Sequence, residues 1–444
     1  MRRVNQSEKA RLFSYFLGLI AVGTVVLVLP LSWAGRGRLP LIDALFTATS
    51  AVCVTGLITV DTAAYSRIGQ VAILLLIQAG GLGIITFSTI YLARVRGRIS
   101  LTGGRAIRAY YLPSVEVEPR RIVRNIVIVT LSIELIGALV LYQGFRGTVQ
   151  DHTGFTAVFH SISAFCNAGF SLFSNNLESY TTNVLVNVTV MLLIVLGGLG
   201  FVVLHDVAAT ALVQKKQLSL HSKIVLVMTA VFVGGGALLY ILFEHQRALT
   251  VFGPGEQIMA ALFQAVTPRT AGFNTIPQGD LTSPSKVLTL LLMFVGGGSG
   301  SIAGGIKINT FFIVLLMALQ GPDSRGEVTV FKRKISGTRI FHAVMHIMKA
   351  LFILFGSVLL LTVTERWVSR HPIEVFVLIF ETFSAFGTVG LSLGATPTLT
   401  VVGKLVIIVT MFMGRIGLLA LAIPRSRPYP VHVLDYPEGE VMIG

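Results

Sequence analysis

Four short glycine-containing stretches carry the most specific chemistry in this chain. Each follows a compact apolar segment, and the four tripeptides are Val54-Thr55-Gly56, Asn167-Ala168-Gly169, Thr270-Ala271-Gly272 and Thr388-Val389-Gly390. Glycine takes backbone angles that other residues avoid and adds no side chain that would block a narrow path. Rings of backbone carbonyls replace the hydration shell of a potassium ion in selective pores. The four stretches therefore predict a cation selectivity filter made of backbone oxygen atoms.

Chance is the alternative explanation, because glycine is common in membrane helices and one such glycine would carry no information. The four glycines, however, stand at matching places after similar segments that open with Phe46, Phe159, Leu262 and Phe380. This repetition favours a filter. The third stretch is one residue shorter from its own phenylalanine, Phe263, so the sequence leaves the register of that loop open.

A second set of glycines follows inside the next apolar run of each unit. The first glycines of this set are Gly80, Gly197, Gly296 and Gly414. Small residues let helices approach closely, which explains the set in units one and two. Unit three departs from that explanation, because glycine and serine crowd the middle of its run. The crowded residues are Gly296, Gly297, Gly298, Ser299, Gly300, Ser301, Gly304 and Gly305. They predict a broken helix and an irregular segment below the filter, a candidate gate, with a simple kink as the alternative.

An arginine, Arg415, replaces a small residue in the second set of unit four. Charges at membrane depth are costly and usually face an aqueous cavity or a partner. A guanidinium near the pore axis would repel a cation and act as a barrier. The alternative is a structural arginine, either snorkelling or ion-paired, and Glu134 is then the leading buried acidic partner.

The composition indicates a membrane protein. Of the 444 residues, 53% are hydrophobic and 12% are charged, whereas soluble domains carry about 25% charged residues. The net charge of +15 comes from basic residues concentrated in alternate loops, which is the positive-inside pattern rather than a nucleic-acid surface. Cys53 and Cys166 each precede a filter glycine by three residues, so equivalent repeat positions explain them better than a disulfide or a zinc site.

The elements that position the four stretches form four units of span, re-entrant helix and span. The predicted segments are 13–33, 41–52 and 70–93, then 122–142, 154–165 and 183–213, then 224–243, 257–266 and 287–319, then 341–363, 373–386 and 399–423. The re-entrant helices are too short to cross a bilayer, and their C-terminal ends direct partial negative charge toward the pore axis.

The predicted fold class is an all-α integral membrane protein with four parallel repeats. Its eight transmembrane helices surround a pseudo-fourfold central pore, and both termini are cytoplasmic. The predicted division is a cytoplasmic N-terminus (1–12), repeats over 13–98, 99–214, 215–320 and 321–424, and a cytoplasmic tail (425–444). Parallel repeats favour a pore over an ion-coupled secondary transporter, whose repeats are usually inverted.

Other polar residues are weaker indicators. His342 and His346 are spaced like zinc ligands but lie at a cytoplasmic helix start, which favours a surface pair. Arg269 beside the third filter either tunes ion entry or braces its helix, and Glu381 is predicted to be structural. No nucleophile–base set or metal cluster lies on facing spans, so an enzyme is not predicted.

These features together resemble the Trk/Ktr/HKT superfamily of cation transporters. The resemblance rests on the four span–pore-loop–span units, one glycine in each filter, the glycine-rich break in unit three and the arginine in the last returning helix. It covers nearly the whole chain and is strongest to the KtrB subfamily, the membrane subunits of bacterial Ktr potassium uptake systems.

The resemblance implies potassium uptake through a channel-like pore in the bacterial plasma (inner) membrane. It implies that Gly56, Gly169, Gly272 and Gly390 select potassium, since a serine in the first filter accompanies sodium preference in the plant branch. It further implies that residues 296–305 form the gating loop and that Arg415 lies beneath the pore. The alternative function is sodium-coupled secondary transport of K⁺ or Na⁺.

The resemblance also implies a homodimer on a cytosolic, KtrA-like ring of RCK subunits that bind ATP or ADP. Many Ktr members are stimulated by sodium. The expected partners are thus this ring and membrane lipid, without nucleic acid. The transported ion is K⁺, and no organic cofactor is expected in this chain, because no G-x-G-x-x-G follows a strand.

Overall fold

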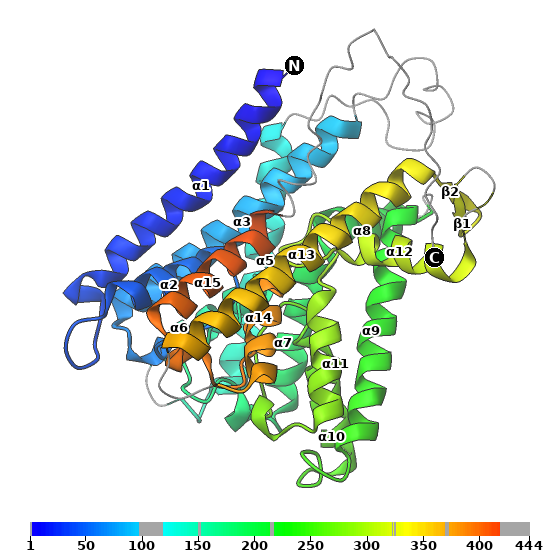
Figure 1. The fold of residues 1–444 in the computed structure, drawn as a ribbon. Coiled ribbons are helices and arrows are strands. Elements are labelled where there is room, and N and C mark those ends of the chain that lie inside the picture. The colour runs from blue at the N-terminus through cyan, green and yellow to red at the C-terminus, as the bar shows by residue number, and fades with distance from the viewer. Residues whose placement is uncertain are drawn as a thin grey trace.

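The computed structural model describes residues 2–96, 119–149, 152–213, 217–321, 323, 326–368 and 373–417. The described chain is mostly helical with very little strand, and its short helices lie among longer ones (Figure 1). The arginine-rich connection at 97–118, the end of the last predicted span and the predicted tail at 425–444 lie outside the described residues.

The first unit contains α1 (Arg2–Val28), α2 (Leu41–Cys53) and α3 (Arg67–Arg96). Helix α1 begins earlier than the predicted span and also ends earlier, at Val28. The reason for the early end is Pro30, because a proline disfavours helical angles at the residue before it. A short 3₁₀ turn, Pro30–Ser32, follows.

The second unit contains α5 (Pro119–Phe145), α6 (Thr153–Phe165), α7 (Val184–Leu199) and α8 (Phe201–Val213). The predicted span over 183–213 is not one straight helix, because α7 and α8 meet at a bend of 100°. Gly200 at the bend has φ of +90°, a conformation that ends a helix and suits glycine alone. A Cβ there would press on the backbone of Gly300 and Ser301, so a segment of unit three occupies the bend.

The third unit contains α9 (Leu220–Glu244), α10 (Pro254–Val266), α11 (Ser283–Phe294) and α12 (Ile308–Gln320). The sequence predicts a break over 296–305, and the structure has a non-helical segment between α11 and α12, residues 295–307, called here the intramembrane segment. Pro254 occupies the first turn of α10, where a missing N–H costs nothing.

The fourth unit contains α13 (Gly337–Val368), α14 (Val375–Gly387) and α15 (Val401–Phe412), which continues as one π-helical turn, Met413–Gly417. A small antiparallel hairpin, β1 (Val328–Val330) and β2 (Arg333–Ile335), precedes α13. The all-α prediction misses this hairpin. Strands of three residues each are too short to show a two-residue periodicity in the sequence.

Among the described residues, five helices are long and apolar enough to cross a membrane, or six if α7 and α8 form one broken span. The five are α1, α3, α5, α9 and α13. The arrangement of eight spans stays a prediction, because α11 and α12 are short apolar helices on either side of a break and α15 runs toward residues outside the description.

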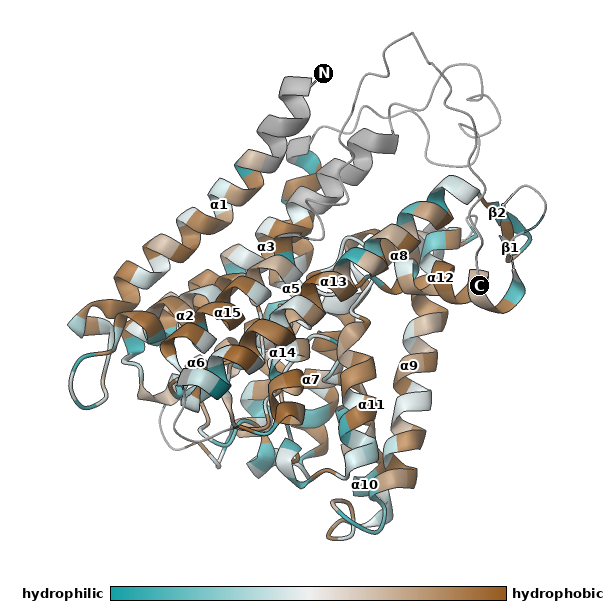
Figure 2. Ribbon diagram, viewed as in Figure 1, coloured by the Kyte–Doolittle hydropathy of each residue, from teal (hydrophilic) through white to brown (hydrophobic). Residues whose placement is uncertain are grey.

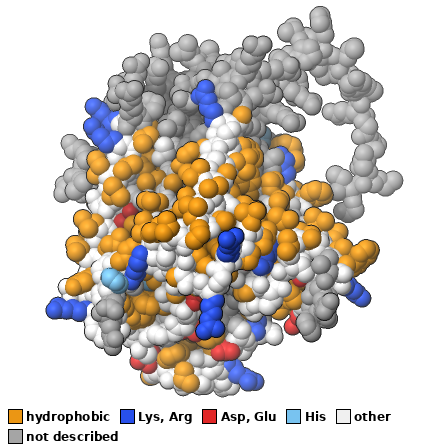
Figure 3. Space-filling model, turned by 90° about the vertical axis from the view of Figure 1, so that its left-hand side faces the viewer, with side chains coloured by type: hydrophobic (Ala, Val, Ile, Leu, Met, Phe, Trp, Pro, Cys, Tyr) orange, Lys and Arg blue, Asp and Glu red, His pale blue; other side chains and the backbone are white. Residues whose placement is uncertain are grey.

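Apolar side chains cover much of the outer surface. Large exposed examples on four helices are Val22, Leu135, Leu242 and Phe352. Hydropathy colouring shows apolar residues along most helices (Figure 2), and on the visible face hydrophobic side chains spread between charged residues, with most acidic ones toward the lower end (Figure 3). Such a surface needs a hydrocarbon environment rather than water.

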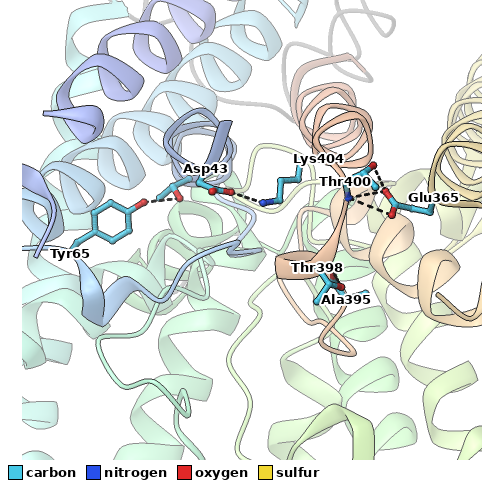
Figure 4. Close-up of polar contacts among 8 residues, drawn as sticks. Asp43, Tyr65, Glu365, Ala395, Thr398, Thr400 and Lys404 are labelled. Carbon is cyan, nitrogen blue, oxygen red and sulfur yellow. Dashed lines mark hydrogen bonds and ion pairs between the residues drawn. The ribbon is translucent and has the colours of Figure 1, made fainter. Parts of the chain in front are cut away.

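Buried polar contacts join unit four to unit one and fix the starts of two returning helices (Figure 4). Lys404 of α15 pairs with Asp43 in the first turn of α2, with Nζ 2.7 Å from Oδ1 and both side chains nearly buried. Glu365 accepts from the backbone N–H and the hydroxyl of Thr400, at 3.1 and 2.7 Å, where α15 begins. Glu244 receives the same two bonds from Thr282 at the start of α11. Units three and four therefore fix their returning helices by the same device.

A substitution at Gly80 of α3 tests how closely the returning segments pack against the short helices. A Cβ at Gly80 would overlap the carbonyl oxygen of Val52, whereas a Cβ at Gly234 of α9 would meet nothing within 4 Å. We expect Gly80→Ala to destabilise the protein by about 1–3 kcal/mol through overpacking. Gly234→Ala should be neutral or stabilising, because alanine favours a helix. Thermal unfolding in detergent measures both, and equal midpoints would contradict the close docking.

Candidate functional site

The four predicted filter loops share one unusual backbone pattern. The residue two positions before each glycine is left-handed, with φ of 54° at Val54, 56° at Asn167, 72° at Thr270 and 50° at Thr388. The glycines themselves have φ of 90°, 68°, 77° and 96° in the same order. Left-handed residues other than glycine are uncommon and persist only where the surroundings hold them. Four such residues at equivalent positions indicate a conformation that the fold imposes.

The structure brings the four glycines together in a closed ring of neighbouring loops. A Cβ at Gly56 would overlap the carbonyl oxygen of Ala168. The same holds for Gly169 and Ala271, for Gly272 and Val389, and for Gly390 and Thr55. Each loop therefore abuts the next, and the fourth abuts the first. No residue with a side chain fits at these positions without moving a neighbouring carbonyl group.

Four hydroxyl side chains that the sequence analysis missed brace these loops. Ser50 Oγ accepts a hydrogen bond from the backbone N–H of Gly56 at 3.0 Å, and Ser384 Oγ accepts one from Gly390 at 3.0 Å. Ser163 donates to the carbonyl of Phe170 at 2.8 Å, and Thr267 donates to that of Phe273. The sequence did contain a signal for these hydroxyl groups, because a serine stands six residues before the glycine in three of the four stretches.

Thr267 also resolves the register of the third loop. It stands five residues before Gly272, whereas the serines stand six residues before their glycines. The N–H groups of both Ala271 and Gly272 point to the carbonyl of Thr267. The third stretch therefore has one residue fewer between its hydroxyl-bearing residue, Thr267, and its glycine. Gly272 nevertheless occupies the same position in the ring as the other three glycines.

The short helices α2, α6, α10 and α14 are each 13 residues long and end just before the loops. Returning segments dock on their ends through glycines of the second set. A Cβ at Gly80, Gly197 or Gly414 would overlap the carbonyl oxygen of Val52, Phe165 or Phe386, respectively. The close approach expected for units one and two therefore extends to unit four. Helix C-terminal ends carry partial negative charge, so they favour a cation near the loops.

The intramembrane segment lies between the second unit and the fourth filter loop. Gly298 donates its N–H to the carbonyl of Gly198 at 2.8 Å, and Ile302 donates to that of Gly197 at 3.4 Å. A Cβ at Gly304 would overlap the hydroxyl of Thr388. Within the segment, Gly296 donates to Ile306 at 2.8 Å. The predicted gate residues thus contact a filter loop on one side and the α7–α8 bend on the other.

Arg415 lies in the π-helical turn and is 4% exposed. Its guanidinium donates to the carbonyl of Ile302 in the intramembrane segment and to that of Gly80, the latter at 3.5 Å. Glu134, the leading acidic partner under the alternative of an ion-paired arginine, does not bind Arg415. The carboxylate of Glu134 instead accepts hydrogen bonds from Gln78 Nε2 at 3.0 Å and from the thiol of Cys166 at 3.8 Å. An α-to-π transition changes where side chains point, and spacing in the sequence does not reveal it.

Lys307 is a second cation at this place that the sequence analysis missed. Its ammonium donates to the carbonyl of Ala303, four residues back in the intramembrane segment. The signal was a lysine directly after an apolar, glycine-rich run, where a charge is costly. Two cations therefore hold carbonyl groups of the segment, Lys307 from within it and Arg415 from the last helix.

Two other singled-out residues have bracing contacts. Arg269 is 7% exposed, donates to the hydroxyl of Thr229 at 3.3 Å and lies over the ring of Phe232. Glu381 accepts from Ser392, from the N–H of Leu393 and from Thr396, so it holds the loop after the fourth filter. These contacts agree with the structural role predicted for Glu381.

The remaining candidates do not join the site. Cys53 and Cys166 are buried free thiols, as their repeat positions suggested. His342 is exposed and His346 is partly buried on α13. No group of three metal-ligating side chains occurs in the part of the chain that the structure describes.

A further carboxylate, Glu178, lies in the loop after α6, where partial burial raises its pKa. It accepts a hydrogen bond at 2.6 Å from Asn274, which follows the third filter loop.

Ser384→Ala tests the hydroxyl braces. It removes the acceptor of the partly buried N–H of Gly390, so we expect a loss of about 1 kcal/mol in stability. Thr382→Val in the same helix is the matched control, because Thr382 only donates to the carbonyl of Leu378 one turn back. Thermal unfolding in detergent should show a clear loss for Ser384→Ala and a smaller one for Thr382→Val. The reverse order would contradict the brace.

Comparisons with known proteins agree over nearly the whole chain. A family model described as TrkH, cation transport protein, matches residues 26–432. The chain is 39% identical to a Ktr system potassium uptake protein B of Bacillus subtilis, over 97% of this chain and 95% of the relative. It is 37% identical to a protein of the same name from Vibrio alginolyticus, over 97% and 93%.

Two further similarities extend the comparison. The chain is 36% identical to the potassium/sodium uptake protein NtpJ of Enterococcus hirae, over 97% of this chain and 95% of the relative. The crystal structure of the potassium transporter TrkH from Vibrio parahaemolyticus matches with a TM-score of 0.73 at 20% identity, over 94% of this chain and 83% of that one. The last similarity shows a shared fold.

Proposed function

Because the chain belongs to the TrkH family of cation transport proteins, we propose that it takes up potassium through a pore lined by its four glycine loops. The family consists of membrane ion transporters rather than enzymes. The observation that carries the proposal is the closed ring in which each filter glycine abuts a carbonyl group of the next loop.

The filter would coordinate a dehydrated cation with backbone oxygen atoms. The four tripeptides contain no acidic side chain, so the carbonyl groups and the negative ends of α2, α6, α10 and α14 supply the attraction. Backbone rings of this kind suit potassium, and relatives with 39% and 37% identity are named potassium uptake proteins. Glycine at all four positions keeps the ring free of side chains.

The intramembrane segment would act as the gate. Its contacts with Gly197, Gly198 and Arg415 would hold it across the route that leads away from the filter loops, and these contacts support the proposal. Lys307 and Arg415 add positive charge there, which raises the electrostatic barrier for a cation. Opening would require the segment to release Arg415 and the carbonyl groups at the end of α7.

A partner would control this gate. Two relatives are named protein B of a Ktr system, which supports a system of more than one component. We infer a homodimer in the inner membrane with both termini cytoplasmic, seated on a cytosolic KtrA-like RCK ring that binds ATP or ADP. The basic connections on one side of the predicted spans support that orientation.

Gly390→Ser tests the filter. A Cβ at Gly390 would overlap the carbonyl of Thr55, so the ring must widen. We expect discrimination between K⁺ and Na⁺ to fall about tenfold or more, as an overpacking penalty of about 1–3 kcal/mol implies. Gly394→Ser is the matched control, since Gly394 has a similar φ of 91° but open space around it. Rubidium flux into proteoliposomes with competing Na⁺ measures both, and equal selectivity of the two variants would refute the filter.

Sodium-coupled transport is the second candidate function. The relative NtpJ is named a potassium/sodium uptake protein, which favours a role for sodium. The same proteoliposomes distinguish the two functions. Potassium accumulation against its own gradient, driven by an inward sodium gradient, would indicate coupling. Flux that only follows the potassium gradient would indicate a pore.

Arg415→Gln tests the gate. It removes a charged hydrogen bond to Ile302, and such bonds contribute about 1.5–3 kcal/mol, so basal potassium flux should rise roughly tenfold. Arg269→Gln removes a buried guanidinium that contacts Thr229 instead of the intramembrane segment, and it should leave basal flux near wild type. Equal effects of the two variants would show that charge alone, rather than the contact with the segment, sets the barrier.

A further inference from the structure

The β1–β2 hairpin is a fixed part of the fold. It connects α12 to α13 at one edge of the molecule (Figure 1). Its buried side chains, Val328 and Ile335, pack with Leu316 of α12 and Ile340 of α13 in a small hydrophobic core. The position of its tip is therefore set by two helices, one of which is long enough to cross a membrane.

The turn of the hairpin has an unexpected sequence. Val330 pairs with Arg333, so the connection is the two residues Phe331 and Lys332, with φ of 49° and 60°. Two-residue turns of this type prefer Asn-Gly, because both residues are left-handed. An aromatic residue and a lysine are poor choices for that backbone. Both side chains are exposed. Neither the geometry of the turn nor packing in the small core therefore explains why a phenylalanine and a lysine stand there.

The surroundings of the tip combine cations with apolar side chains. Arg339 at the start of α13 is exposed, as is Lys332, while Lys334 pairs with Glu327 at 3.0 Å. Leu319 at the end of α12 is 75% exposed and Phe341 at the start of α13 is 62% exposed. Phe341 belongs to a candidate span whose outer face lipid must cover. The apolar surface of the membrane-facing helices therefore continues onto the hairpin.

We propose that the hairpin tip, formed by Phe331, Lys332 and Arg339, binds the anionic headgroups of the cytoplasmic leaflet. Aromatic rings favour the level of the headgroups, and lysine and arginine pair with phosphate. Continuity with the lipid-facing surface favours lipid over a protein partner. The inference does not depend on the proposed filter or gate, but it rests on the proposed orientation, which puts the hairpin on the cytoplasmic side of the membrane.

Tryptophan fluorescence of the full chain tests the inference. The chain has two tryptophans, so Phe331→Trp in a Trp33→Phe, Trp367→Phe background reports on the tip alone. The protein is reconstituted in phosphatidylcholine vesicles in which roughly a quarter of the lipid is brominated, as phosphatidylglycerol or as phosphatidylcholine. Both brominated lipids should quench the tryptophan, and phosphatidylglycerol should do so more strongly.

Charge variants separate headgroup binding from simple contact with lipid. Lys332→Gln and Arg339→Gln should each weaken the preference for phosphatidylglycerol roughly fivefold, the equivalent of about 1 kcal/mol per cation. Arg247→Gln is the matched control, because it removes an exposed cation between α9 and α10, at the far end of α9. That variant should leave the preference unchanged.

Two results would overturn the inference. If neither brominated lipid quenches the tryptophan while iodide in solution does, the tip faces water or a cytosolic partner. If quenching is equal for both lipids in every variant, the tip touches lipid without recognising anionic headgroups. Iodide quenching also serves where a variant reconstitutes poorly. A tip that binds anionic headgroups should be shielded from iodide more strongly in anionic than in neutral vesicles. Potassium flux does not enter either readout.

Discussion

The close approach of backbone to backbone around the four glycines of the proposed filter is the constraint on which the rest of the structure depends. Each glycine faces a carbonyl group of the next loop where no Cβ fits. The residues two positions earlier are left-handed, which the loops maintain only because hydroxyl groups and helix ends hold them. Ser50 and Ser384 do so directly, by accepting the N–H groups of Gly56 and Gly390. Glycines of the returning segments then bring those segments against the short helices.

One buried and one partly buried cation are the second feature of the site, and the structure satisfies both with carbonyl groups. Arg415 donates to the carbonyls of Ile302 and Gly80, and Lys307 donates to that of Ala303. A carboxylate beside either one would neutralise the charge and would also attract the permeating cation. Carbonyl groups satisfy the donors while leaving the positive charge in place. That charge can then oppose a cation while the intramembrane segment is held.

The four units follow one plan, and they differ in their returning segments, where the predicted gate needs one unit to be unlike the others. Units three and four begin their returning helices with the same acid–threonine contact, Glu244 to Thr282 and Glu365 to Thr400. They diverge at membrane depth, where unit three has the intramembrane segment and unit four a π-helical turn. Unit two bends at Gly200, where it meets that segment. Three of the four returning segments are therefore irregular, and the irregular parts of units two and four both contact that of unit three.

Local pattern in the sequence determined the positions of the apolar segments and short helices, the four glycines and the break in unit three. These features depend on residues close together in the chain, such as the glycine run at 296–305 and the apolar lengths that a bilayer requires. The sequence also indicated that Arg415 was unusual, because a charge in an apolar run is costly wherever it points.

Only the tertiary structure decided which distant groups meet. The order in which the loops abut, the partner of Arg415 and the bend at Gly200 all depend on residues separated by up to several hundred positions. Glu134 was a reasonable partner by depth alone, but Gln78 and Cys166 occupy its carboxylate. The turn at Phe331 and Lys332 runs against local preference, so no local pattern could have predicted it. At the loops, at Arg415 and at the Gly200 bend, the contacts join residues from two or more repeats, so packing between units decides the structure there.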